Sequence, residues 1–153
     1  MMRGLLIGAA AGAAGTTALN AVTYLDMAVR GRGSSGTPEQ TVEVLADRAG
    51  VGIPGDPDTR DNRLQGLGSL SGIITGVSIG ALIGALRSAG LVPGRVLGPL
   101  ITGGLAMAGA NVPMARLGIS DPSEWGAQDW AADVVPHLAY GAVTHAVLEA
   151  VGD

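Results

Sequence analysis

The chain has 153 residues and contains no cysteine, no lysine and no phenylalanine. Without cysteine there is no disulfide framework, thiolate zinc site, iron–sulfur cluster or cysteine nucleophile. Because all nine basic residues are arginine, a Walker-type phosphate loop and Schiff-base chemistry are excluded as well. Two tryptophans and two tyrosines offer little surface for stacking nucleic-acid bases, and a net charge of −4 disfavours binding to a phosphate backbone. The composition therefore predicts no nucleic-acid partner.

Charged residues are scarce and unevenly placed. They make up 14% of the chain, against about 25% in an ordinary soluble domain. Apolar stretches of about 20 residues match the ~30 Å hydrocarbon core of a bilayer, whereas soluble helices rarely run so long without a charge. The pattern predicts an all-α, polytopic membrane protein in a lipid bilayer. Four windows contain no Asp, Glu, Lys or Arg: residues 4–25, 64–86, 96–115 and 134–148.

We expect a single membrane domain over residues 1–153, with a surface segment at 30–63. The first apolar stretch is longer than the roughly 7–15 residues of a secretory signal core, which favours a retained anchor. Six arginines in the first and third connections, against three on the other side, predict that both termini are external. Four transmembrane helices are predicted, at about 4–28, 64–86, 96–117 and 130–151.

Short helices are expected at the membrane surface. Thr37, Pro38 and Gln40 have the spacing of a capping box, and apolar residues then recur at helical spacing, so an interfacial amphipathic helix is predicted over 38–49. The segment 121–124 repeats this kind of start and predicts a helix of one or two turns. Indole and phenol rings favour the headgroup level of a bilayer. The aromatic belt expected on this side consists of Tyr24, Trp125 and Trp130.

Glycine forms the most regular pattern in the chain. Small residues at every fourth position let helix backbones approach closely where lipid offers no hydrophobic driving force between helices. The pattern predicts helix packing, within the chain or between subunits, with a pore-forming glycine zipper as the alternative. Residues 76–80 also spell G-x-S-x-G, but a hydrolase elbow needs a strand-to-helix turn and this serine lies in mid-helix. The two glycine ladders are Gly68, Gly72, Gly76, Gly80 and Gly84, and Gly4, Gly8 and Gly12.

Polar and ionisable residues inside a predicted span are costly unless they find a partner. Counting about 1.5 Å per residue from the span centres places Asn20, Asn111 and His137 in the same half of the bilayer, roughly 5–8 Å from its midplane. Asp26 and Asp133 fall in the layer above. The candidate polar site is therefore Asn20, Asp26, Asn111, Asp133, His137, Tyr140 and His145.

The last predicted span carries a polar stripe of the kind that belongs inside a bundle. Pro136 frees the backbone carbonyl of Ala132 beside His137, and irregular backbone next to an ionisable group is typical of transport sites. Hydrogen bonds that merely hold helices together are the alternative interpretation. The stripe consists of Asp133, His137, Gly141, His145 and Glu149.

No metal site and no cofactor are predicted. His137 and His145 are separated by about 12 Å along a helix axis, so the two imidazoles of one chain cannot bind one ion. A haem held by His137 of two subunits is the alternative.

Three segments stand in a distinctive order: 20–26 (Asn-Ala-Val-Thr-Tyr-Leu-Asp), 37–48 (Thr-Pro-Glu through Leu-Ala-Asp-Arg) and 129–141 (Asp-Trp-x-x-Asp-Val-Val-Pro-His-Leu-Ala-Tyr-Gly). With these segments the chain resembles uncharacterised small four-helix membrane proteins of actinobacteria. The His-Leu-x-Tyr-Gly motif at 137–141 is similar, more distantly, to the YagU-type inner-membrane family. Both resemblances imply a multi-pass protein of the bacterial cytoplasmic membrane, and neither implies a known reaction.

No complete catalytic constellation is present, so no catalytic residue is predicted. The leading hypothesis is a non-enzymatic membrane scaffold or assembly protein, because the helix-packing pattern dominates the sequence. A homo-oligomer or a membrane-protein partner is expected with it. The alternative hypothesis is a small transporter or a proton- or ion-coupled binding protein that uses Asn20, Asn111, Asp133 and His137.

Overall fold

The computed structural model describes residues 1–91 and 94–151, and every regular element in this part of the chain is helical. The all-α prediction is confirmed. The helices are α1 (Met2–Arg30), α2 (Thr37–Arg48), α3 (Pro57–Ser88), α4 (Leu97–Arg116), the 3-10 helix η1 (Pro122–Glu124) and α5 (Ala127–Val151).

Local sequence explains where the long helices begin and end. The carboxylate of Asp56 caps α3 by accepting the backbone N–H of Thr59 at 3.0 Å, and Pro57 follows in the first turn, where a missing N–H costs nothing. The N–H and the hydroxyl of Thr59 together lower the pKa of the Asp56 carboxyl. α1 ends at Gly31, whose φ of 63° is a left-handed conformation that glycine adopts without strain.

The two short helices differ in detail from their predictions. α2 covers nearly the predicted range, but Gly36 is its N-cap and Thr37 is already helical, so the predicted capping box is wrong. The backbone carbonyl of Gly36 accepts the N–H of Gln40 at 3.1 Å, so the helix begins one residue upstream of the predicted start, at Thr37. After Asp121 the chain forms only the single 3-10 turn η1 before it becomes extended at Trp125.

Among the described residues, three helices, α1, α3 and α5, are long and apolar enough to cross a membrane. They correspond to three of the four predicted spans. α4 has 20 residues but does not reach the same mean hydropathy, so the span predicted over 96–117 is not confirmed. Its four glycines, two prolines and Asn111 dilute the apolar content of the helix.

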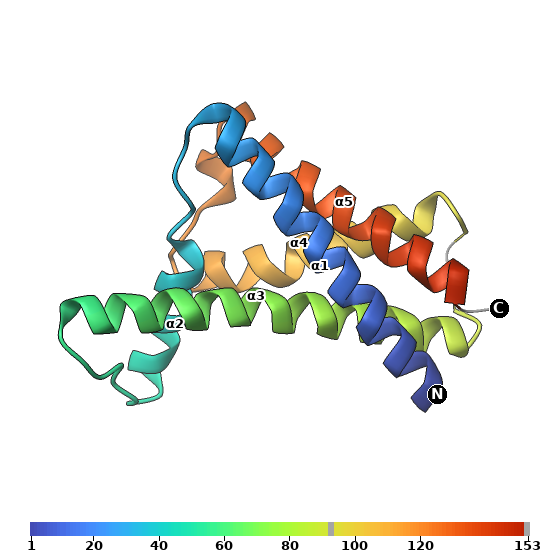
Figure 1. Ribbon diagram of the computed structural model, residues 1–153, viewed down its shortest axis with the longest axis horizontal. Helices are drawn as coiled ribbons and strands as arrows, with labels where there is room; N and C mark the ends of the chain where they lie inside the picture. The colour runs from blue at the N-terminus through green and yellow to red at the C-terminus, as the bar shows by residue number, and fades with distance from the viewer. Residues whose placement is uncertain (92–93, 152–153) are drawn as a thin grey trace.

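The long helices run alternately up and down (Figure 1). Gly4 at the start of α1 lies against Ser88 at the end of α3, and Gly12 lies against Gly76, so α1 and α3 are antiparallel. α1 also packs on α5, α4 packs along α5, and α2 rests on α3. The start of α1 and the end of α5 lie at the same end of the bundle.

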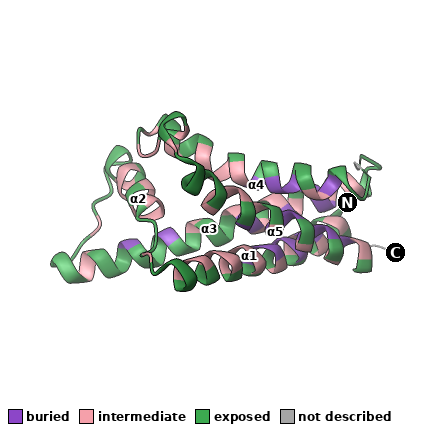
Figure 2. Cartoon of the chain, turned by 90° about the horizontal axis from the view of Figure 1, so that it is seen from above, coloured by how far each residue is buried: buried purple, intermediate pink, exposed green. Residues whose placement is uncertain are grey.

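Burial is inverted with respect to a soluble protein. Figure 2 shows the buried residues along the sides of α1, α3, α4 and α5 that face each other. Apart from a small cluster of Ala11, Ile83 and Leu148, these positions are held mainly by Gly and Thr. Large apolar side chains point outward instead: Leu6 is 67% exposed and Ile74 is 63% exposed. The helices are therefore joined through their smallest residues.

Candidate functional site

The glycines of α1 and α3 bring the two backbones into direct contact. A Cβ placed on Gly80 would lie within 3 Å of the Cα and N of Gly12 and of the carbonyl oxygen of Gly8. A Cβ on Gly84 would meet the backbone of Gly8 in the same way. No side chain fits between the helices here, so the crossing of α1 and α3 requires glycine on both sides. We call this contact of Gly4, Gly8 and Gly12 with Gly76, Gly80 and Gly84 the glycine seam.

The ladder of α3 is regular in sequence but not in its surroundings. Gly68 faces the backbone of Pro38 and Glu39 at the start of α2, not α1. Gly72 is exposed, and nothing lies within 4 Å of the place where its Cβ would be. The glycine ladder of α3 therefore packs against α1 over Gly76, Gly80 and Gly84, against α2 at Gly68, and against no other helix at Gly72.

A second set of glycines, which sequence reasoning missed, joins α4 to α5. A Cβ on Gly103 would lie 2.6 Å from the carbonyl oxygen of His137, and a Cβ on Gly141 would lie 2.8 Å from the N of Gly103. Gly98 faces the imidazole ring of His145. Gly98 and Gly103 are five residues apart and so form no i+4 ladder, which is why the glycine spacing in the sequence did not predict this contact.

Three of the predicted polar residues come together where the end of α4 meets the start of α5. Asn111 donates from Nδ2 to Oδ2 of Asp133 at 2.7 Å. His137 Nδ1 lies 2.7 Å from the backbone carbonyl oxygen of Asp133 and 3.4 Å from its Oδ1. A carbonyl oxygen can only accept, so Nδ1 carries the proton and Nε2 is the ring nitrogen available to a ligand. We call these three residues the polar cluster.

Asn20 and Asp26 do not join the polar cluster. The carboxylate of Asp26 binds Nε of Arg32 at 2.6 Å and Nη1 of Arg30 at 3.5 Å. Arg30 is the last residue of α1 and Arg32 lies just beyond it, so Asp26 forms its ion pairs locally and not with another helix. Asn20 is half-buried on α1 and has no side-chain hydrogen bond within residues 1–91 and 94–151. The layer expected from counting along the spans is thus assembled only on α4 and α5.

Tyr140 and His145 lie deeper than the polar cluster. The hydroxyl of Tyr140 donates to the backbone carbonyl oxygen of Gly76 at 2.6 Å and thereby ties α5 to the glycine seam. His145 is only 3% exposed, and its Nε2 has no hydrogen-bond partner among the described residues. Thr102 and Thr144 are completely buried, and their hydroxyls also lack a partner in this part of the chain. Thr102 was missed because a lone threonine in an apolar window carries no periodic signal.

Pro136 is accommodated inside α5 without ending the helix, which runs on to Val151. The nearby imidazole of His137 binds the carbonyl of Asp133, and not the Ala132 carbonyl that the proline frees from its helical bond. Pro136 therefore lies beside His137, but the imidazole is hydrogen-bonded to the preceding turn of α5 and not to the carbonyl that the proline frees.

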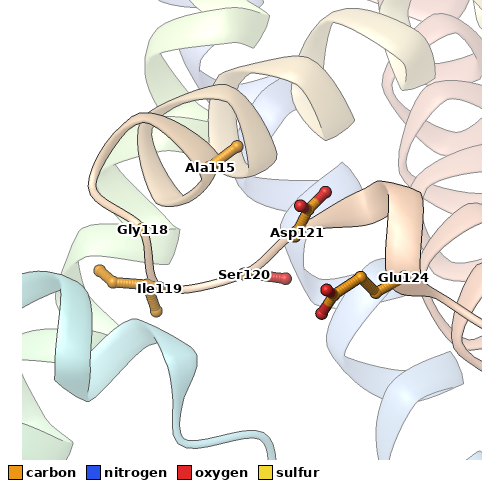
Figure 3. Close-up of a pocket in the computed structure, with 6 residues that line it drawn as sticks. All are labelled: Ala115, Gly118, Ile119, Ser120, Asp121 and Glu124. Atoms are coloured by element: carbon orange, nitrogen blue, oxygen red, sulfur yellow. The ribbon is translucent and has the colours of Figure 1, made fainter.

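The loop between α4 and α5 encloses a shallow hollow (Figure 3). Within this loop the hydroxyl and the N–H of Ser123 both donate to the Asp121 carboxylate and lower the pKa of that group. Trp125 donates from Nε1 to the Ser120 hydroxyl at 3.1 Å and packs edge-on against Trp130, with ring centroids 5.1 Å apart. The hollow is lined by Ala115, Gly118, Ile119, Ser120, Asp121 and Glu124.

The described residues offer few side chains that could bind a metal ion or a cofactor. Within residues 1–91 and 94–151 no three His, Asp or Glu side chains are close enough to hold a metal ion together. Nε2 of His137 is the imidazole nitrogen that a haem iron shared between two subunits would use, and this alternative stays a prediction.

The chain matches no protein-family model, no curated protein and no solved structure.

Proposed function

We propose that this protein is a non-enzymatic scaffold or assembly protein of the bacterial cytoplasmic membrane. The observation that carries the proposal is the inverted burial, with small residues between the helices and large apolar residues outside. Water drives large apolar side chains inward in a soluble protein, whereas lipid does not, so a membrane bundle is stabilised by close contact of small residues. The three candidate spans supply the required length. The resemblance to small actinobacterial membrane proteins agrees with this location.

We include α4 as a fourth transmembrane helix in this proposal. Its 20 residues extend about 30 Å, the thickness of the hydrocarbon core. It runs antiparallel to α5 from Gly98 beside His145 to Asn111 beside Asp133, so it shares the depth of a candidate span. Its outward side carries Leu100, Ile101 and Leu105. A helix so placed would expose this apolar side to water unless lipid covered it.

The glycine seam supports an assembly role. Backbone contact between α1 and α3 leaves little room for the two helices to rock against each other, which suits a rigid platform. Gly72 on α3 and Gly104 on α4 have open space where a side chain would be, so a helix of a second copy or of another membrane protein can approach there.

The test is cross-linking in the native membrane. A photoreactive residue replaces exposed Gly72, and in a matched variant it replaces Leu6 on the outward side of α1. A scaffold should give a discrete cross-linked species from position 72 at expression levels near native. The proposal fails if the chain remains monomeric and uncross-linked from both positions.

A small transporter is the second candidate function, and the polar cluster favours it. The polar cluster places two ionisable side chains, Asp133 and His137, beside Asn111 at the junction of two helices. Ionisable residues within membrane helices are commonly functional. His137→Gln keeps size and hydrogen bonding but replaces the imidazole by a carboxamide, which does not take up a proton. A scaffold should fold, assemble and complement normally with this change, whereas a transporter should fold and lose its activity or its pH dependence.

A further inference from the structure

The inward side of α5 carries polar groups along nearly the whole thickness of a bilayer. Asp133 and Glu149 are 16 positions apart, which corresponds to about 24 Å of helix against a hydrocarbon core of ~30 Å. Both end groups are partly exposed at the bundle surface: the side chain of Asp133 is 20% exposed and that of Glu149 is 38% exposed. Between them lie His137, Tyr140, Thr144 and His145 on α5, and the neighbouring α4 carries the buried Thr102.

Two threonines in the middle of this row differ from Thr16, Thr17 and Thr75 in how the hydroxyl is bonded. Thr16 and Thr75 each donate their hydroxyl to the carbonyl four residues earlier, at 2.8 and 2.9 Å. This is the usual way for a helix to satisfy a threonine. Thr102 and Thr144 are completely buried and do not do so. Thr144 instead directs Oγ1 to the place where Gly15 of α1 has no side chain.

His145 adds a third buried polar atom to these two hydroxyls. Its ring fills the space that a side chain of Gly98 would occupy, and its Nε2 has no partner among the described residues. Arg87 at the end of α3 and Glu149 one turn further along α5 are the charged groups near it, and Arg95 pairs with Glu149 at 3.6 Å. Buried polar atoms without protein partners are normally satisfied by internal water. Three such atoms, on Thr102, Thr144 and His145, lie between the carboxylates at the two ends of the row.

We propose that the inward side of α5 conducts protons across the bilayer through water bound at Thr102, Thr144 and His145. Hydroxyl and imidazole groups both donate and accept hydrogen bonds, so with water between them they relay a proton without moving far. Asp133 with His137 receives the proton at the α2 end of the bundle, and Glu149 releases it at the end where α1 begins. The inference rests on the membrane placement of α4 and α5 proposed above and not on an assembly role.

The experiment measures proton flux into liposomes that contain the full chain. The protein is reconstituted in phosphatidylcholine and phosphatidylglycerol vesicles with trapped pyranine, and a potassium gradient with valinomycin supplies the voltage. Flux above that of protein-free vesicles is expected for the parent chain. Asp133→Asn, His145→Phe and the pair Thr102→Val with Thr144→Val should each lower it by about tenfold, which equals ~1.4 kcal/mol on a barrier.

Matched controls separate conduction from folding. Leu138→Val changes an outward residue and should conduct like the parent. Resistance of each variant to carbonate extraction shows that it is inserted. An inserted parent chain without flux overturns the conduction proposal and leaves the scaffold proposal intact, whereas a chain that carbonate extracts overturns the membrane placement itself. A threonine-to-valine pair that conducts normally and melts at a higher temperature also overturns the proton path, because the hydroxyls would then bind nothing.

Discussion

The hydroxyl of Tyr140 donates to the backbone carbonyl oxygen of Gly76 at 2.6 Å, across 64 residues of sequence. Tyr140 reaches this carbonyl because Gly15 and Gly76 present no side chains in its way. One hydrogen bond therefore links α5 to the α1–α3 crossing, and the glycines of that crossing also make room for the largest fully buried side chain of the described residues.

Tyr140→Phe should lower the stability of the folded bundle in detergent. It removes the hydroxyl but keeps the ring, so the expected loss is about 0.6 kcal/mol and at most ~1.7 kcal/mol, the range of interhelical hydrogen bonds in membranes. Tyr24→Phe is the control because Tyr24 is 61% exposed. Thermal unfolding that moves equally in both variants would contradict a special role for the bond to Gly76.

Gly80→Ala and Gly72→Ala should have opposite effects although both glycines belong to one ladder. A methyl group at position 80 collides with the backbone of Gly12, and such overpacking costs about 1–3 kcal/mol. At position 72 the methyl group meets open space, so the higher helix propensity of alanine can stabilise the helix by up to ~1 kcal/mol. Denaturation of the two variants in mixed micelles measures the difference. Equal stabilities would show that the glycine seam is not a tight contact.

Reporter fusions decide whether α4 crosses the membrane. With four spans, a reporter at Gly90 and a reporter after the last residue lie on the same side, and a reporter at Gly118 lies on the opposite side. With three spans, Gly90 and the C-terminal reporter lie on opposite sides. We expect the first result, with Gly90 and both termini external.

Asn111 and Asp133 should be energetically coupled, whereas Asn20 and Asp133 should not. The hydrogen bond between Asn111 and Asp133 predicts a coupling of about 0.6 kcal/mol in a double-mutant cycle with alanine. Asn20 has no hydrogen bond to Asp133, so its cycle should close near zero. Coupling of similar size in both cycles would mean that the polar layer includes α1 after all.

Acid should loosen the turn at Asp121. The pKa of this carboxyl is held below its usual 3.8 by Ser123, so its contribution is complete above the unfolded pKa and is lost as pH falls through the lower folded pKa. Trp125, which is bonded to Ser120 in the same turn, reports the change by fluorescence. Asp121→Asn should remove the transition, and Asp58→Asn, which lies far from this turn, should leave it unchanged. A midpoint above 3.8 would contradict the assignment.

Much of the architecture could be predicted from the sequence because membrane helices are recognised by composition. Windows without charge predicted helices that correspond to α1, α3, α4 and α5, and three of them have the apolar character of spans. The start of α2 was predicted one residue late, because the first helical hydrogen bond runs from the N–H of Gln40 to the carbonyl of Gly36 and no side chain caps the helix. Span lengths also placed Asn20, Asn111 and His137 at one depth and Asp133 in the layer above. Depth alone did not tell which of the polar residues at that level would meet.

The sequence by itself determined that the helices form and that their small residues repeat, since both follow from local composition and period. Only the tertiary structure decided which face of each helix meets which neighbour. It separates Gly80, pressed against Gly12, from exposed Gly72, and it joins Asn111 to Asp133 while Asp26 turns to Arg32. The physical reason is that period and depth define positions along a helix axis, whereas contact depends on the angle at which two axes cross. That angle is set by the backbone approach of α1 to α3 and of α4 to α5.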